Sequence, residues 1–349
     1  MRVVEELEVD GSYGEGGGQI LRTALTFSIV MSRPIHVSKI RAGRDPPGLR
    51  PQHAATVHIL RDISGGLIEG VEVGSTEIRF APGKIQSGEM VVDLKTAASI
   101  TLLLQAVVPT VSISRASLDL TLVGGTDVPW SPTFDYLAYV TKPVLEKVGI
   151  DFEVEAQRRG YYPRGGGRVR AKIKECKTLQ PLDLQGRTES TPVSIYSRCG
   201  GLLRHVAERQ AKAAEDFLRS GGVKADAVSV SVEDSSSPGS SILISTVGSG
   251  CYIGSDSIGA RGKTAESVGT EAAREFLGAS RGSVAVDPHL ADTLLPLLAL
   301  AKGTSRLLVS EVTEHLRTSL HIAALFTNCE YEFEETKGVW LAEISSSKP

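Results

Sequence analysis

Hydrophobic residues recur along the chain at two spacings, one helical and one extended. Between Ile20 and Ile29 the apolar side chains stand three or four positions apart, which predicts an amphipathic helix. This spacing predicts helices over 18–31, 50–64, 97–108, 133–147, 205–220, 264–278, 288–302 and 314–326. Short runs between glycine turns predict strands at 35–40, 77–80, 89–93, 118–123, 151–155, 168–173, 193–197, 228–232, 242–246 and 306–309. The fold is therefore expected to mix α and β.

These elements follow a recurring order. Helices alternate with strands around 18–93, again around 97–173 and a third time around 288–345, which makes a threefold repeat a hypothesis, although no residue-level repeat is visible. Between Leu184 and about Ser280 the order changes, with a polar stretch at 186–191 and a charged helix flanked by strands. We expect an α+β fold in which this segment is a small inserted domain.

Composition narrows the class of protein. With 349 residues, 41% of them hydrophobic, the chain can bury a large core, and we expect two domains. No apolar run approaches the ~20 residues that span a bilayer, and the N-terminal segment lacks the apolar core of a signal peptide. We therefore expect a cytoplasmic protein with no membrane partner. The four cysteines form no CxxC pair, which predicts reduced structural residues.

The first candidate site is EGGGQILR, residues 15–22, at the start of the first predicted helix. Three glycines let backbone N–H groups approach an anion, and the helix dipole favours negative charge there. Glu15 is a candidate metal ligand and Arg22 a candidate phosphate ligand. The run fits neither the Walker pattern nor the dinucleotide fingerprint, so a plain helix-entry loop remains the alternative.

A basic stretch follows at 39–53, where four lysines and arginines face a single acid, Asp45. Such local charge stands out in a chain of formal net charge -3. The planar guanidinium matches phosphate oxygens in pairs, so Arg41 and Arg44 are candidate phosphate ligands. Gln52 and His53 are candidate phosphate or ribose contacts. The alternative is a solvated basic loop.

The second candidate site is His315, at the start of the helix that follows the strand ending at Val309. A strand-to-helix junction presents a side chain where ligands often bind, and neighbouring N–H groups can neutralise a phosphate. A neutral imidazole nitrogen is a nucleophile that can form a phosphoramidate. The alternative is a helix-cap histidine, with Thr313 or Glu314 completing the cap.

A second basic stretch surrounds Tyr161 and Tyr162, with no acid among residues 157–170. Arginines beside aromatic rings are typical of a groove for single-stranded nucleic acid, and a solvated hairpin is an equal alternative. The arginines concerned are Arg158, Arg159, Arg164, Arg168 and Arg170.

Seven segments in order resemble one family, the RNA 3′-terminal phosphate cyclases. They are EGGGQILR, IRAGR…PGL…QH, LLLQAVVP, GGTDVPWSP, RRGYYPRGGG, HLADTLLPLLALA and EHLRTSLHIA, and the resemblance extends from residue 10 to about 345. It implies three repeated units of two helices on a four-stranded sheet, with a small inserted α/β domain. The expected domains are 1–183 with 281–349, and 184–280.

The resemblance also implies an activity. Members of the family use ATP to convert an RNA 3′-phosphate end to a 2′,3′-cyclic phosphate, through a histidine–AMP intermediate and an RNA-adenylate intermediate. His315 would then be the nucleophile, and a divalent cation (Mg²⁺ or Mn²⁺) on Glu15 would neutralise the triphosphate. RNA 3′-phosphate ends would be the partner.

Position by position, the resemblance assigns the remaining ligands. Arg22, Arg41, Arg44, Gln52 and His53 would hold phosphates or the RNA end. His289 stands where the family often has a tyrosine that stacks on adenine. The nucleotide ligands would be Gln105, Pro132, His289, Leu290, Ala291, Asp292 and Thr293, and Trp130 would either join them or lie in the core.

Other readings stay open at this point. Some relatives act as non-catalytic RNA-binding factors in ribosomal RNA maturation and lack the nucleophilic histidine, which His315 provides here. A carboxyvinyl transferase is a further rival, because its domains share a related architecture, but its motifs are absent from the sequence. A homodimer is an open alternative for the assembly.

Overall fold

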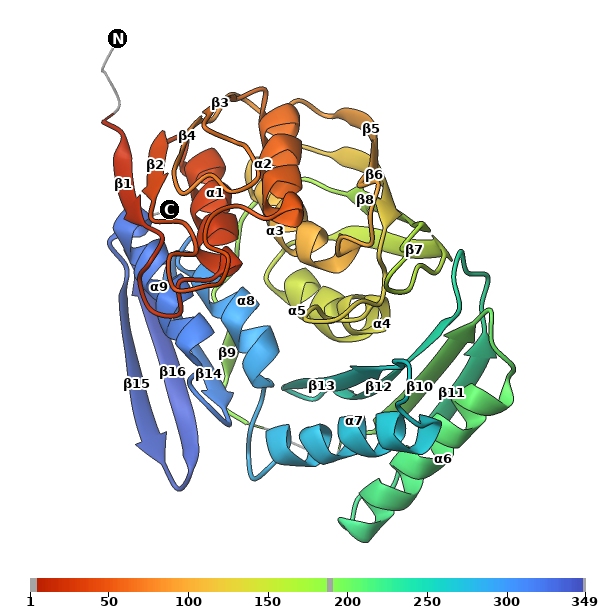
Figure 1. The fold of residues 1–349 in the computed structure, drawn as a ribbon. Helices are drawn as coiled ribbons and strands as arrows, with labels where there is room; N and C mark the ends of the chain where they lie inside the picture. Colours follow the sequence, from red (N-terminus) through yellow and green to blue (C-terminus); the bar gives the residue numbers. More distant parts are fainter. Residues whose placement is uncertain (1–4, 187–190, 348–349) are drawn as a thin grey trace.

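The computed structural model describes residues 5–186 and 191–347 (Figure 1). Most of the predicted polar stretch at 186–191 therefore lies outside the described residues. The helices gather in the centre of the molecule while three of the sheets lie at its periphery, and a fourth sheet with two helices stands apart at one side (Figure 1).

The first sheet contains β1 (Leu7–Asp10), β2 (Ile35–Ser38), β4 (Ile78–Ala81) and β3 (Leu67–Glu69), hydrogen-bonded in that order. Helix α1 (Gly18–Met31) connects β1 to β2, which run parallel, and α2 (Pro51–Ser64) connects β2 to β3. A parallel pair needs a crossover connection, and α1 provides it.

The second sheet repeats this order with β5 (Gly88–Asp93), β6 (Leu118–Gly124), β8 (Gly167–Ile173) and β7 (Phe152–Arg158). Its first crossover is α3 (Ile100–Ile113). The second is a continuous helical stretch of α4 (Phe134–Tyr136), a π-helical turn η1 (Leu137–Thr141) and α5 (Lys142–Lys147). The π-helical turn is the local widening that often occurs near functional sites.

The third sheet has the order β9 (Asp183–Leu184), β14 (Gly303–Val309), β16 (Val339–Ser346) and β15 (Glu330–Thr336). Its helices are α8 (Pro288–Leu298) and α9 (Glu314–Thr327). In each of the three sheets, the strands thus pair in the order first, second, fourth, third.

Between β9 and α8 the chain forms the fourth sheet, of β11 (Ala227–Val232), β10 (Val193–Gly200), β12 (Gly239–Gly248) and β13 (Cys251–Ile258). Helices α6 (His205–Ser220) and α7 (Ala265–Ala279) cover one face of it (Figure 1). The side chains between them form a hydrophobic cluster separate from the main core, so this segment has its own interior.

One main core joins the three peripheral sheets. It contains the inward faces of α1, α3, α8 and α9 together with alternate residues of the strands, as in β6, where buried and half-buried positions alternate. Among the described residues, no helix is long and apolar enough to cross a membrane. All four cysteines are buried and none forms a disulfide, which confirms the prediction of reduced structural residues.

The α+β prediction is confirmed, and every predicted helix has a counterpart in the structure. The largest differences at helix ends are at α3, which begins three residues later than expected and runs on to Ile113, and at α8, which ends at Leu298. Strands β1, β3, β9, β13, β15 and β16 were not predicted individually. Several of them are short or lie at a sheet edge, where alternation gives a weak signal.

Candidate active site

A cavity of about 640 Å³ opens between helices α1, α3 and α8, the start of α9 and the segment from β10 to α7, called the inserted segment below. This volume is in the range of small-molecule sites. Six separate parts of the chain line it, and their lining residues include Gln19, Arg22, Gln105, Val128, Pro129, Trp130, Ser131, Pro132, Asp256, Lys263, Glu271, Glu275, His289, Asp292, Thr293 and His315. The two candidate sites of the sequence, Arg22 and His315, therefore face one cavity.

The glycine run shapes one wall at the start of α1. Gly16 has φ +60°, a left-handed conformation that favours glycine, and it turns the chain into the helix. Gly18 has no room for a side chain, because a Cβ there would lie 2.4 Å from Nε2 of His53. The run thus brings Glu15, Arg22 and His53 close together, which a larger side chain would prevent.

Glu15 contacts both His315, which lines the cavity, and Arg44. Its Oε1 lies 2.8 Å from Nδ1 of His315, and its Oε2 accepts a hydrogen bond of 3.0 Å from Arg44. The His315 contact has ion-pair distance without hydrogen-bond alignment. The Thr313 side chain caps α9 by accepting from the N–H of Leu316, so His315 is not itself the cap. The alternative is therefore right about Thr313 as a capping residue and wrong about His315 as the cap.

Electrostatics keep the imidazoles neutral and the guanidinium charged at neutral pH. Burial lowers the pKa of His315, an effect that the Glu15 carboxylate opposes and Arg22 adds to. The pKa of His53 falls to about 4, first through burial and then through Arg22 and Arg41. Burial lowers the pKa of Arg22 to about 10, against the attraction of Glu15, so Arg22 keeps its charge.

Among the predicted phosphate ligands, Arg22, Gln52 and His53 lie together. They line a second, small cavity of about 20 Å³, and Arg22 lines both cavities. Nδ1 of His53 accepts a hydrogen bond of 3.2 Å from the N–H of Arg50, so the neutral ring carries its proton on Nε2 and can donate it to an anion.

The other two predicted phosphate ligands have protein partners. Arg41 donates to the carbonyl oxygens of Pro46 and Gly48, at 3.0 Å each, and so holds its own loop together. Arg44 donates to Glu15. Of the pair, only Arg44 contacts a residue beside the cavity.

Helical periodicity divides the residues of segment 289–293 between the cavity and the core. His289, Asp292 and Thr293 line the cavity, together with Gln105 of α3 and Pro132 of the loop before α4. Leu290 and Ala291 are almost fully buried in the main core instead. The structure therefore places their side chains behind the cavity wall, where they support α8.

Asp292 is a buried carboxyl without a cationic hydrogen-bond partner. Its side chain accepts a hydrogen bond from the Thr313 hydroxyl, and its backbone carbonyl accepts one from Gln19 at 3.2 Å. Burial raises the pKa of Asp292 to about 7, although the Thr313 bond opposes this. At neutral pH its carboxyl is therefore close to half protonated.

The inserted segment contributes a wall that sequence reasoning missed. Asp256 lies on β13 and Lys263 in the turn after it, whereas Glu271 and Glu275 lie on α7. Burial raises the pKa of Asp256 to about 6, while a hydrogen bond of 2.6 Å from the N–H of Thr133 opposes the shift. The negative residues of this segment are spread over twenty positions, so no local motif marked them.

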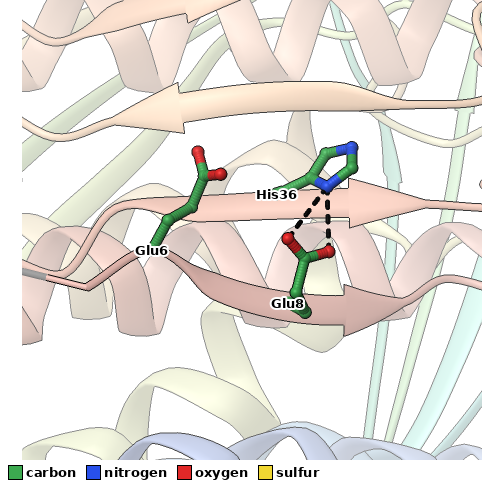
Figure 2. A group of neighbouring side chains, drawn as sticks. All are labelled: Glu6, Glu8 and His36. Carbon is green, nitrogen blue, oxygen red and sulfur yellow. Dashed lines mark hydrogen bonds and ion pairs between the residues drawn. The ribbon is translucent and has the colours of Figure 1, made fainter.

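Glu15, the predicted metal ligand, is a single carboxylate whose two oxygens contact His315 and Arg44. Magnesium is commonly held by one or two carboxylates, with phosphate oxygens and water as its other ligands. Throughout the described ranges, the group of three metal-type side chains that lies close together is a different one, Glu6, Glu8 and His36 (Figure 2). Glu8 lies on β1, His36 on β2 and Glu6 just before β1; His36 contacts Glu8 at 2.8 Å, and Arg79 pairs with Glu6.

The predicted RNA groove at 158–170 is contradicted for its central arginine. Arg159 is buried and pairs with three acids, Asp127, Asp135 and Glu233. Arg170 pairs with Asp119 in the same way across neighbouring strands. The acids that neutralise this stretch lie elsewhere in the chain, which is why residues 157–170 alone seemed purely basic.

Trp130 is not a core residue. Its exposed fraction is 96%, and it borders the cavity between Pro129 and Pro132. The core alternative for this side chain is therefore wrong.

Comparisons with known proteins place the chain in one family. A model of the family described as RNA 3′-terminal phosphate cyclase matches residues 13–333. The chain is 43% identical over 335 residues to the RNA 3′-terminal phosphate cyclase of Thermococcus kodakarensis, covering 96% of each chain. It is 40% identical over 339 residues to that of Pyrobaculum aerophilum, covering 97% of each chain.

Among solved structures, the enolpyruvyl transferase NikO from Streptomyces tendae matches 97% of this chain and 48% of its own, at 10% identity. Its TM-score of 0.38 is too low to support an argument. The family match covers most of the chain, and the relatives match it nearly end to end. This chain belongs to the RNA 3′-terminal phosphate cyclase family.

Proposed function

We propose that this protein uses ATP to convert an RNA 3′-phosphate end to a 2′,3′-cyclic phosphate, with His315 as the nucleophile. Family membership supports the reaction class. The observation that carries the assignment of His315 is its contact with Glu15 at 2.8 Å on the wall of the cavity, beside Arg22.

In the first step, Nε2 of His315 attacks the α-phosphorus of ATP. The new N–P bond forms as the bond to the leaving pyrophosphate breaks. The contact of Nδ1 with Glu15 favours the tautomer whose proton is on Nδ1, and a small rotation of the ring aligns the two as a hydrogen bond. The lone pair of Nε2 is then free, and the lowered pKa of His315 keeps it unprotonated at neutral pH.

In the second step, an oxygen of the RNA 3′-phosphate attacks the phosphorus of the histidine-bound AMP, and His315 leaves. The adjacent 2′-hydroxyl then attacks the 3′-phosphorus, which closes the ring and expels AMP. Because this closure is intramolecular, holding the RNA end in place supplies much of its rate advantage.

The proposed ligands divide into those that would hold a phosphate and those that would hold the adenine. Arg22 stands between the two cavities, where its fork can reach a phosphate, and His53 adds a neutral Nε2–H donor. Gln105, Pro132 and His289 would enclose the adenine. A divalent cation on Glu15 would neutralise charge on the triphosphate.

Labelling with α-³²P-ATP tests the proposal directly. The wild type and His315→Ala are incubated with the label and a divalent cation, and the protein-bound label is tested for lability in acid and stability in alkali. We expect labelled wild type and unlabelled variant. His321→Ala is the matched control, because His321 lies on the same helix and stacks on Tyr13 at 3.7 Å, away from the proposed chemistry.

Label on His315→Ala would move the nucleophile to another residue. No label on folded wild type that still binds RNA would sink the ATP mechanism and favour a non-catalytic RNA-binding factor.

We also propose the finer architecture. The shared strand order of the three peripheral sheets supports three repeated units. The separate hydrophobic cluster supports an inserted domain over 184–280, within a larger domain of 1–183 and 281–349. A cytoplasmic location and a homodimer remain predictions from the sequence.

A further inference from the structure

Trp130 presents a large aromatic ring to solvent at the edge of the proposed active site. Its exposed fraction is 96%, and it lines the same cavity as Gln105, His289 and His315. We propose that Trp130 is a stacking platform for a base of the RNA strand close to its 3′ end. This inference rests on the proposed function, because it assigns a second contact to the same substrate.

The loop that carries Trp130 is fixed on both sides. The Thr101 hydroxyl donates to the carbonyl of Pro132 at 2.7 Å, and the Ser131 hydroxyl donates to the carbonyl of Val128 at 2.9 Å. The N–H of Thr133 donates to Asp256 at 2.6 Å, which ties the loop to the inserted segment. A ring held on such a loop loses little conformational freedom when it binds a ligand.

The backbone at Trp130 has an unfavourable conformation for a large side chain. Its φ is +61°, in the left-handed region that bulky residues rarely adopt. Conformations of this kind cost of order 1–3 kcal/mol and tend to occur at ligand contacts. Neither this backbone conformation nor the exposure of a large aromatic ring stabilises the folded protein. Together they point to a role for the ring in binding.

Charge favours a base over a phosphate at this part of the cavity. Asp256, Glu271 and Glu275 line it from the inserted segment, and the one lysine there, Lys263, pairs with Glu271. These carboxylates repel a sugar–phosphate backbone. Bases are uncharged, and every base has a face that stacks on an aromatic ring regardless of sequence.

The position of Trp130 favours the RNA strand over ATP. A cavity of about 640 Å³ is large enough to enclose a nucleotide, whereas a strand must continue out of it through the rim. Trp130 faces solvent at that rim. The strand therefore passes the ring, and ATP has no need to.

Fluorescence can report this contact without turnover. The chain has two tryptophans, and Trp340 lies on β16, so Trp340→Phe leaves Trp130 as the single reporter. This variant is titrated, without ATP, with an RNA oligonucleotide ending in a 3′-phosphate, and separately with ATP alone. We expect saturable quenching with the RNA and none with ATP. Quenching by ATP and not by RNA would overturn the assignment in favour of adenine.

Kinetics provide the second test. Stacking energies predict that Trp130→Ala raises KM for the RNA by about 5- to 150-fold, while KM for ATP is unchanged. Trp130→Phe, which keeps an aromatic ring, should recover most of the loss. Oligonucleotides that lack one base, at the last or the next-to-last nucleotide, should identify the base that stacks. With the oligonucleotide that lacks this base, wild type and Trp130→Ala should have the same KM.

The two proposals fail in different ways. If the wild type cyclises RNA but Trp130→Ala has the same KM for RNA and the reporter shows no quenching, the stacking platform is overturned and the proposed function stands. If His315 carries no label but RNA still quenches Trp130, the base contact stands and the ATP chemistry is overturned.

Discussion

Two arginine clusters of this protein are alike in sequence and opposite in structure. Arg22 lines a cavity, and Arg44 pairs with Glu15, which contacts His315 on the wall of the same cavity. Arg159 is buried and its charge is matched by Asp127, Asp135 and Glu233. Arg22 keeps its positive charge available for a ligand, whereas the charge of Arg159 is neutralised by acids inside the fold.

The difference shows that a basic stretch cannot be assigned to ligand binding until the acids that pair with it are located. Asp127 and Asp135 lie more than twenty positions before Arg159, and Glu233 lies in the inserted segment. The Arg159 pairs therefore connect the second sheet to that segment. An arginine that fastens two parts of a molecule and one that binds a substrate can have the same local sequence.

The largest effect that we predict concerns this buried cluster. Arg159→Ala leaves Asp127 buried without its cation and Asp135 with Arg198 alone, which should lower the free energy of unfolding by about 3–5 kcal/mol. Denaturant unfolding measures it. The rate of the remaining folded molecules should change little. A variant as stable as the wild type would remove the contrast between the two clusters.

The next effect is on catalysis at the cavity. Arg22→Ala should lower kcat/KM for RNA cyclisation by about 10²- to 10³-fold, the usual result of losing one charged donor to a phosphoryl group. Its stability should not fall in parallel, because burial already disfavours the charged form of Arg22. Arg22→Lys is the matched control, since it keeps the charge but loses the planar fork. Equal losses of stability and activity would make Arg22 another structural arginine.

The sequence predicted regular elements well and contacts between distant segments poorly. Helix α6 is recovered at both ends because its apolar stripe and its charged face are both local. β9 has two residues and pairs with β14, which is more than a hundred positions away, so no local pattern could reveal it.

The site shows the same limit. Glu15, Arg22 and His315 belong to compact motifs; Arg22 and His315 line the cavity, and Glu15 contacts His315. Leu290 and Ala291 were carried over with their neighbours as ligands, yet helical periodicity turns them into the core. Asp256 and Glu275 had no motif, because an acidic wall arises only when the inserted segment folds against the large core.

A pH effect distinguishes the cavity acid from the paired acids. The pKa of Asp292 is raised from 3.8 to about 7, so the folded protein binds more protons than the unfolded chain between those values. Its contribution therefore makes stability fall as the pH rises from about 4 to about 7. Asp292→Asn, which mimics the protonated side chain and can still accept from Thr313, should remove that fall, on the order of 4 kcal/mol. Melting temperatures of both proteins across this range measure it, and parallel curves would contradict the prediction.

The smallest effect tests whether the exposed arginines of the second stretch contribute to RNA binding. Arg158 contacts Asp234 at 3.1 Å and Arg168 donates to Gln157 at 3.0 Å, both at the surface, so the double variant Arg158→Ala/Arg168→Ala should lose less than about 1 kcal/mol of stability. If neither arginine contacts phosphate, KM for RNA and its salt dependence should stay unchanged. Two lost phosphate contacts would instead reduce the slope of log KM against log salt by about 1.4. Such a change would mean that only Arg159 is structural and that its neighbours still guide the RNA, so the contrast would hold between single residues and not between clusters.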